Sequence, residues 1–134
     1  MATSKVKYSG SLRTECVHLN SGSVIHTDAP LDNNGKGEKF SPTDLLATAY
    51  ASCMLTIIGI HCQDNDIHFA HGEADVTKVM ASGPRRIVEL HIEMDLRGNG
   101  WDEQTAERII RVAEACPVAK SVHPDIKIEI KYHV

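Results

Sequence analysis

The chain has 134 residues, a length that favours one compact domain or one protomer of an oligomer. Apolar residues make up 42% of it and charged residues 24%, which is typical of a soluble globular protein and argues against disorder. The net charge is −4 and there is no run of Lys or Arg, so neither nucleic acid nor an anionic membrane surface is an expected partner.

The first part of the chain predicts three short strands within residues 4–27. Apolar positions there are separated by turn signals at Ser9-Gly10 and at Asn20-Ser21-Gly22. A polar, glycine-rich segment follows at residues 32–38. It has neither GxGxxG nor Walker spacing, so we interpret it as a loop and not as a phosphate-binding site.

A long apolar helix is predicted from Pro42 to His61. Ser41 can cap its N-terminus, Pro42 suits the first helical position, and Asp44 interacts favourably with the helix dipole. The segment is apolar almost all the way round, which is typical of a helix buried on every side. We therefore expect a central helix that is wrapped by sheet and lies at a dimer interface.

A β-hairpin is predicted from residues 67–81 and 86–97. The second arm alternates apolar with charged residues, so one of its faces is expected to point into the core. In the first arm Ala70, Gly72 and Ala74 share a face, which leaves room for a helix to pack closely.

A second helix is predicted from Asp102 to Ala115, and a final alternating strand over residues 126–134. The element order is therefore βββ-α-ββ-α-β. This order predicts an α+β fold in which hairpins segregate the strands and no βαβ series appears.

The chain carries no clear targeting or membrane signal. The apolar stretch from Leu45 to Ile60 is shorter than a membrane span requires and is interrupted by polar residues, so no transmembrane helix is expected. The N-terminus lacks the apolar core of a signal peptide, which predicts a cytoplasmic protein with reduced thiols. The 4 cysteines form no CxxC pair and the 8 histidines have no zinc-finger spacing, so neither a metal nor a cofactor is expected.

Two cysteines have surroundings that favour chemistry. Cys53 lies inside the apolar helix, and Cys116 directly precedes Pro117. Free cysteine is among the most buried residue types, so both can simply belong to the core. However, Pro117 predicts a new helical turn at Cys116, whose unpaired backbone N–H groups would favour a thiolate. The run Ala49-Tyr50-Ala51-Ser52 leaves space for a reactant to approach Cys53.

The segment Ser41-Pro-x-x-Leu-Leu-Ala-x-Ala-x-Ala-Ser-Cys53, with the later Ala115-Cys-Pro-Val-Ala-Lys120, resembles the OsmC/Ohr family, in its general OsmC-like branch. This family comprises osmotically inducible and organic-hydroperoxide-resistance proteins. The resemblance covers nearly the whole chain, as one domain over residues 1–134. It implies the OsmC-like fold in an intertwined homodimer. It also implies a stress-response peroxidase that reduces organic hydroperoxides to alcohols and is regenerated by an external dithiol.

The resemblance also assigns roles to residues. Cys53 matches the peroxidatic cysteine, Cys116 the resolving cysteine, and Arg13 stands where the family's active-site arginine would fall. The family's glutamate position holds Thr43 here, so Asp44 or Glu38 is expected to act as the carboxylate partner.

The chemistry of these residue types agrees with that assignment. A thiolate attacks the peroxide, and a permanently charged guanidinium at Arg13 would offset the desolvation of Cys53. Cys53 then becomes a sulfenic acid, and Cys116 condenses with it to a disulfide if the two α-carbons lie within about 7 Å. Apolar side chains near Cys53 would favour an organic peroxide; these are Phe40, Leu46, Met54 and Ile57.

Other interpretations remain open. Cys16 and Cys62 fit structural roles, and a metal site from Cys62, His61, His68 and His71 is less expected than ordinary core or surface histidines. A rival function is an OsmC-fold protein that binds an apolar or electrophilic ligand in the interfacial pocket without peroxidase turnover, because one fold can host several functions.

Overall fold

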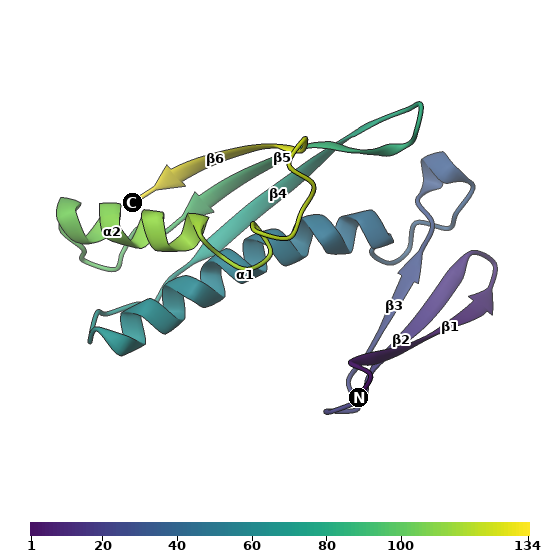
Figure 1. The fold of residues 1–134 in the computed structure, drawn as a ribbon, viewed down its shortest axis with the longest axis horizontal. Coiled ribbons are helices and arrows are strands. Elements are labelled where there is room, and N and C mark those ends of the chain that lie inside the picture. Colours follow the sequence, from purple (N-terminus) through teal and green to yellow (C-terminus); the bar gives the residue numbers. More distant parts are fainter. The chain divides into compact units, whose positions relative to one another are not determined.

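The elements follow one another in the predicted order βββ-α-ββ-α-β, in a computed structural model that describes residues 1–134 (Figure 1). The chain divides into two units, residues 1–46 and residues 47–134, each with its own three-stranded sheet. The α+β class is therefore confirmed, whereas the single domain over residues 1–134 stays a prediction.

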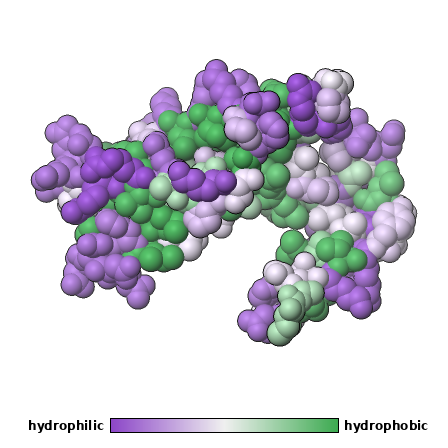
Figure 2. All heavy atoms as spheres, in the orientation of Figure 1, coloured by the Kyte–Doolittle hydropathy of each residue, from purple (hydrophilic) through white to green (hydrophobic).

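The first unit is built on an antiparallel sheet of β1 (Ser4–Gly10), β2 (Arg13–His18) and β3 (Val24–Asp28). In its register Val6, Cys16 and Ile25 lie opposite one another. Because side chains alternate between the faces of a sheet, these residues share one apolar face. Val6 and Ile25 are exposed, so nothing within the first unit covers this face, and hydrophobic atoms are visible on the surface of the molecule (Figure 2).

The glycine-rich loop folds back on the end of β3, after a short 3₁₀ turn at Leu31–Asn33. The Gly35 N–H donates to the Pro30 carbonyl at 2.9 Å, and the Gly37 N–H donates to the Ala29 carbonyl at 3.2 Å. A Cβ atom at Gly35 would lie 1.7 Å from the Ala29 carbonyl oxygen. The loop therefore requires a glycine at this position because the backbone approaches too closely for a side chain.

The central helix α1 (Pro42–Asp64) begins at the predicted residue and ends three residues later than predicted. A capping box fixes its start: the Asp44 N–H donates to Ser41 Oγ at 3.0 Å, and the Ser41 N–H donates to Asp44 Oδ2 at 2.9 Å. One stripe of α1 is buried in the core of the second unit, including Tyr50 and Met54, while Ile60 is exposed. Burial on every side is therefore not reached within one chain.

The expectation that the central apolar segment is too short to span a membrane was wrong about its length. Helix α1 has 23 residues and a mean hydropathy of 1.7 over its best window, which is long and apolar enough to cross a membrane. The small polar residues Ser and Thr lower the hydropathy too little to exclude such a span. Core helices of soluble proteins meet the same criterion, so this property carries little weight by itself.

The second unit contains the sheet β4-β5-β6. Strands β4 (Glu73–Ala81) and β5 (Arg86–Asp95) form the predicted antiparallel hairpin. Strand β6 (Lys127–His133) pairs with β5 in parallel, and α2 (Glu103–Glu114) connects them. Strands β5 and β6 with α2 thus form one βαβ unit, while no series of such units is present, as expected. Parallel strands such as β5 and β6 are joined by a long connection that contains a helix, so no short turn sequence marks their pairing.

Strand β4 begins at Glu73, later than the predicted residue 67. In the segment before it, the side chain of Asn99 makes the backbone hydrogen bonds that a neighbouring strand would otherwise make. The Asn99 Oδ1 atom accepts from the backbone N–H groups of Ala70 and His71 at 2.8 and 3.0 Å, and Asn99 Nδ2 donates to the His71 carbonyl. These bonds satisfy the backbone without a ladder. A Cβ atom at Gly72 would lie 3.0 Å from Leu55 of α1, which agrees with the expected close helix packing.

Candidate active site

The two cysteines singled out by the sequence meet in the second unit. Cys53 is half-buried in the middle of α1, and Cys116 lies just beyond the C-terminal end of α2 with 0% of its surface exposed. Both thiols are free, Cys53 packs against the core cluster that contains Cys116, and Cys53 adds to the rise in the pKa of Cys116 that burial causes. The fold thus brings together two sulfur atoms from distant parts of the sequence.

The Cys116 thiol lies in a turn of the predicted kind. The Ala119 N–H donates to Cys116 Sγ at 3.4 Å, and the Lys120 N–H donates to the Cys116 carbonyl at 3.2 Å. Burial nevertheless raises the pKa of the Cys116 thiol, and the N–H of Ala119 offsets only part of that rise. The expectation that this turn favours a thiolate at Cys116 was therefore wrong, because burial outweighs the backbone donor.

Two phenols and a carboxylate lie in the same part of the second unit as the thiol pair, and the sequence analysis did not identify them. Tyr50 lies on α1, one helical turn before Cys53, and is 5% exposed. Burial raises the pKa of Tyr50, and negative charge on Cys116, Glu114 or Cys53 raises it further. The Tyr132 hydroxyl on β6 donates to Glu114 Oε1 at 3.0 Å. Burial, followed by this bond, raises the pKa of Tyr132.

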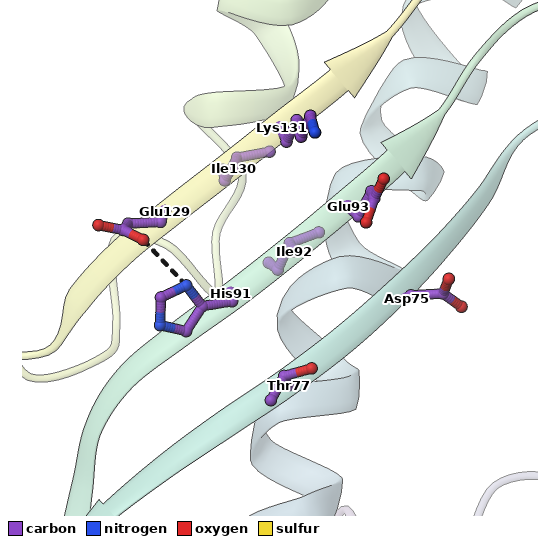
Figure 3. Close-up of a pocket in the computed structure, with 8 residues that line it drawn as sticks. All are labelled: Asp75, Thr77, His91, Ile92, Glu93, Glu129, Ile130 and Lys131. Carbon is purple, nitrogen blue, oxygen red and sulfur yellow. Dashed lines mark ion pairs between the residues drawn. The ribbon is translucent and has the colours of Figure 1, made fainter.

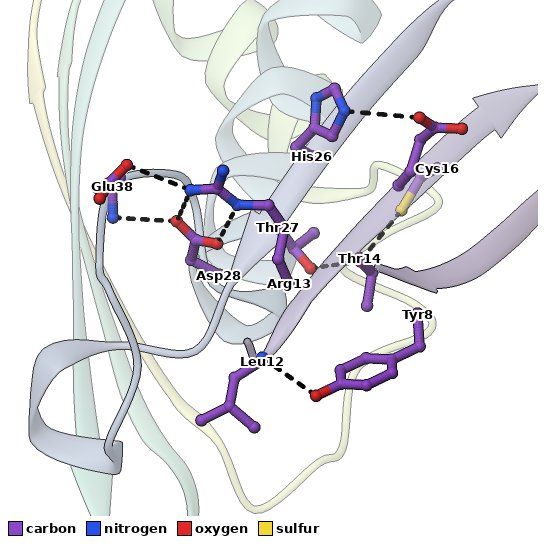
Figure 4. Close-up of polar contacts among 10 residues, drawn as sticks. Tyr8, Leu12, Arg13, Thr14, Cys16, His26, Thr27, Asp28 and Glu38 are labelled. Carbon is purple, nitrogen blue, oxygen red and sulfur yellow. Dashed lines mark hydrogen bonds and ion pairs between the residues drawn. The ribbon is translucent and has the colours of Figure 1, made fainter. Parts of the chain in front are cut away.

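Arg13 belongs to the first unit, where it forms a two-point ion pair on the sheet (Figure 4). Its Nε atom donates to Asp28 Oδ1 at 2.7 Å and its Nη2 atom to Asp28 Oδ2 at 2.9 Å. Nη2 also lies 3.3 Å from Glu38 Oε2. The bonds to Arg13 lower the pKa of the Asp28 carboxyl to about 2, against the opposing effect of burial, and Asp28 in turn raises the pKa of Arg13.

Asp28 is the main carboxylate partner of Arg13, and the sequence analysis did not name it. Its side chain is 1% exposed, whereas that of Glu38 is 64% exposed. Of the two expected carboxylates, Glu38 does contact Arg13, while Asp44 takes part in the capping box of α1. Arg13 and Asp28 are direct cross-strand partners in the β2–β3 register, which was the one signal that could have revealed the pair.

The four apolar residues expected to line a substrate pocket do not behave alike. Met54 is fully buried in the core, Ile57 is half-buried, and Phe40 and Leu46 are exposed. A groove of about 310 Å³ does run along α1 and β4 in the second unit. Its lining consists of Thr48, Ala51, Ser52, Leu55, Thr56, Ala74 and Val76.

The remaining candidates lie elsewhere. Cys62 is buried and its pKa is raised by burial, as for a core thiol. No group of three or more His, Cys, Asp or Glu side chains in residues 1–134 is placed to hold a metal ion. A hollow of about 420 Å³ lies over the β4-β5-β6 sheet, where His91 pairs with Glu129 at 2.9 Å (Figure 3). Its lining contains no cysteine, so it is separate from the thiol pair.

Comparisons with known proteins bear on the family and the fold. The family model described as "OsmC-like protein" matches residues 35–131. A crystal structure from Psychrobacter arcticus 273-4, named provisionally as an osmotic stress induced and detoxification response protein, is 55% identical in sequence. The match covers 99% of this chain and 96% of that one, with a TM-score of 0.94.

More distant structures share the fold. An organic hydroperoxide resistance protein OsmC from Legionella pneumophila is 17% identical, with a TM-score of 0.77 and coverage of 100% of this chain and 98% of that chain. The organic hydroperoxide resistance protein OhrB of Bacillus subtilis is 16% identical, with a TM-score of 0.63 and 98% coverage of each chain. No protein of curated function matches the sequence.

Proposed function

The chain belongs to the family of OsmC-like proteins, and from that premise we propose that it is a thiol-dependent peroxidase that reduces organic hydroperoxides to alcohols. The observation that carries the proposal is the thiol pair, in which Cys53 packs against the core cluster that contains Cys116 and both thiols are free. Two proteins with the same fold are named organic hydroperoxide resistance proteins, which supports organic hydroperoxides as the substrate class.

The unequal burial of the two thiols supports their assignment. Cys53 is half-buried and can be reached by a small reactant, whereas Cys116 is fully buried. A raised pKa also keeps Cys116 in its thiol form, and a thiol is a poor nucleophile. Cys53 is therefore the proposed attacking residue and Cys116 the resolving residue.

The proposed reaction has two steps. The Cys53 thiolate attacks the outer oxygen of the hydroperoxide, the O–O bond breaks, and Cys53 becomes a sulfenic acid as an alcohol leaves. Cys116 then attacks the Cys53 sulfur, a disulfide forms, and the sulfenic oxygen leaves as water. An external dithiol restores both thiols, and no cofactor takes part.

Arg13 is the proposed cation for the first step, on the basis of the family resemblance. A guanidinium stays charged throughout the accessible pH range and can donate to peroxide oxygens. Asp28 holds the Nε and Nη2 atoms of Arg13, while Nη1 makes neither of these bonds. Asp28 thus supplies the carboxylate that the resemblance leads one to expect near this arginine.

We further propose a cytoplasmic homodimer. The sheet face that carries Val6 and Ile25 is apolar and exposed, and helix α1 exposes Ile60 on the side away from its buried stripe. Exposed apolar surface on each unit supports an interaction with a partner. A second copy of the chain is the proposed occupant, in agreement with the expected intertwined assembly.

The experiment that tests the proposed function is a thiol titration of denatured protein before and after one equivalent of cumene hydroperoxide, with peptide mapping. We expect the loss of two thiols and a Cys53–Cys116 disulfide. In Cys116→Ser, a sulfenic acid should accumulate on Cys53 and react with a dimedone probe. Cys16→Ser is the matched control, and it should form the disulfide as the unmodified protein does.

The rival function makes a different prediction. A protein that only binds an apolar or electrophilic ligand would keep all four thiols after exposure to hydroperoxide. That outcome would remove the peroxidase proposal.

A further inference from the structure

We propose that Tyr50 is a catalytic residue of the peroxidase reaction, in which its hydroxyl protonates the departing alkoxide and its phenolate then takes the proton from the buried thiol of Cys116. This inference rests on the proposed function and extends it to a residue that no comparison assigns. Three observations about the second unit lead to it.

The first observation is the position of Tyr50. It precedes Cys53 by one turn of α1, and side chains three residues apart lie on the same face of a helix. Tyr50 and Cys116 belong to one buried core cluster, and Cys53 packs against that cluster. Tyr50 is therefore one helical turn from Cys53 and in the same buried cluster as Cys116, so its phenol belongs to the part of the core that holds both cysteines.

The second observation is the burial of the site. Tyr50 is 5% exposed and Cys116 is 0% exposed. An alkoxide formed against such a surface has limited access to water, although it is a strong base that requires a proton to leave. The buried Cys116 thiol equally needs a base that water does not readily supply. A phenol in the same buried cluster can satisfy each requirement in turn.

The third observation is the distribution of charge. Burial raises the pKa of Tyr50, and negative charge on Cys116, Glu114 or Cys53 would raise it further. The hydroxyl is therefore protonated at neutral pH and can act first as an acid. Once it has given up its proton, the phenolate is a strong base beside a thiol, and transfer back from Cys116 is favourable.

Protons and electrons balance over the cycle. In the first step the Cys53 thiolate, ROOH and the Tyr50 phenol give Cys53 sulfenic acid, ROH and the Tyr50 phenolate. In the second step the phenolate removes the proton of Cys116. In the third step the Cys116 thiolate displaces hydroxide from Cys53, and hydroxide takes up the proton that solvent received when Cys53 first ionised. Two thiols are oxidised and one peroxide is reduced.

Tyr132 is a poorer candidate for this role. Its hydroxyl already donates to Glu114 Oε1 at 3.0 Å. A hydroxyl has one proton to donate, and here a carboxylate accepts it. Tyr132 and Glu114 are therefore neighbours of the proposed acid and not its replacement.

The test compares two oxidants in single-turnover reactions of Tyr50→Phe. The alcohol from tert-butyl hydroperoxide leaves as a strong base, whereas acetate from peracetic acid is a weak base that leaves without a proton. In a Cys116→Ser background, which isolates the first step, we expect Tyr50→Phe to slow oxidation by tert-butyl hydroperoxide by about 10²–10⁴-fold. Oxidation by peracetic acid should keep its rate. With Cys116 present, Tyr50→Phe should slow disulfide closure after tert-butyl hydroperoxide but not after peracetic acid, because no Tyr50 phenolate forms when acetate leaves.

Two controls separate chemistry from structure. Tyr8→Phe alters an exposed tyrosine of the first unit and should leave both oxidation rates unchanged. Alkylation of Cys53 by iodoacetamide should keep its rate in Tyr50→Phe, because that reaction needs no proton donor. If Tyr50→Phe does not fold, 3-fluorotyrosine at position 50 keeps the hydroxyl and changes its acidity. It should then alter the rate with tert-butyl hydroperoxide but not with peracetic acid.

The outcomes are distinct. Equal slowing with both oxidants, or no slowing with either, overturns the role of Tyr50 while the peroxidase function stands. If the unmodified protein is oxidised by neither compound, the proposed function fails and this inference fails with it.

Discussion

The interior position of Met54 leads to a prediction about stability that also tests its expected role in substrate binding. The side chain follows Cys53 on α1 and is 0% exposed. Met54→Ala removes buried apolar surface and leaves a cavity, which in protein cores costs about 2–5 kcal/mol of the free energy of unfolding. With a urea m-value of about 1–3 kcal/mol/M, the urea midpoint should fall by on the order of 1–2 M.

The assay follows urea unfolding through the fluorescence of Trp101, the only tryptophan, whose ring centroid lies 5.8 Å from that of Phe69. All variants are compared at one protein concentration, since a dimer becomes more stable as concentration rises. The control is Leu31→Ala, because Leu31 is 77% exposed and its truncation should change the free energy of unfolding by less than about 0.5 kcal/mol. A midpoint for Met54→Ala equal to that of the control, with a raised KM for hydroperoxide, would refute the core assignment.

Three further predictions concern the first unit and the start of α1. Ser41→Ala removes one half of the capping box and should lower the free energy of unfolding by about 1 kcal/mol, as measured by urea unfolding. Gly35→Ala should disrupt the loop, because its Cβ atom would lie 1.7 Å from the Ala29 carbonyl oxygen; loss of loop amide protection in hydrogen exchange would demonstrate this, and unchanged protection would contradict it. Asp28 has a pKa lowered from 3.8 to about 2 by Arg13, so its stabilising effect should be present above pH 4 and lost as the pH falls toward 2, and Asp28→Asn should flatten this part of the urea-midpoint profile.

Local sequence signals predicted the elements of the fold well, and long-range pairing explains where they did not. The capping residues Ser41 and Asp44 marked the start of α1 because a helix N-terminus depends on adjacent residues. The start of β4 was misplaced because Asn99, far along the chain, satisfies the backbone of His71. The parallel pairing of β5 with β6 likewise depends on a crossover through α2, for which the sequence has no short turn signal.

The candidate site shows the same division. A family motif singled out Cys53 and Cys116, and in the fold Cys53 packs against the core cluster that contains Cys116. Asp28 escaped notice because its role depends on the β2–β3 register, which places it opposite Arg13. The protonation state of the Cys116 thiol could not be predicted from the neighbouring Pro117 either. The sequence indicated a turn with backbone donors, but only the packed core reveals that burial outweighs them.

The burial of Cys116 connects the stability of the core with the proposed order of the reaction. A fully buried thiol with a raised pKa does not compete with Cys53 for the peroxide, and it is protected from oxidation to sulfinic acid. It becomes reactive only when a base next to it takes its proton. If that base is the Tyr50 phenolate, it forms only after Cys53 has reacted, so the resolving cysteine is activated by the step that creates its target.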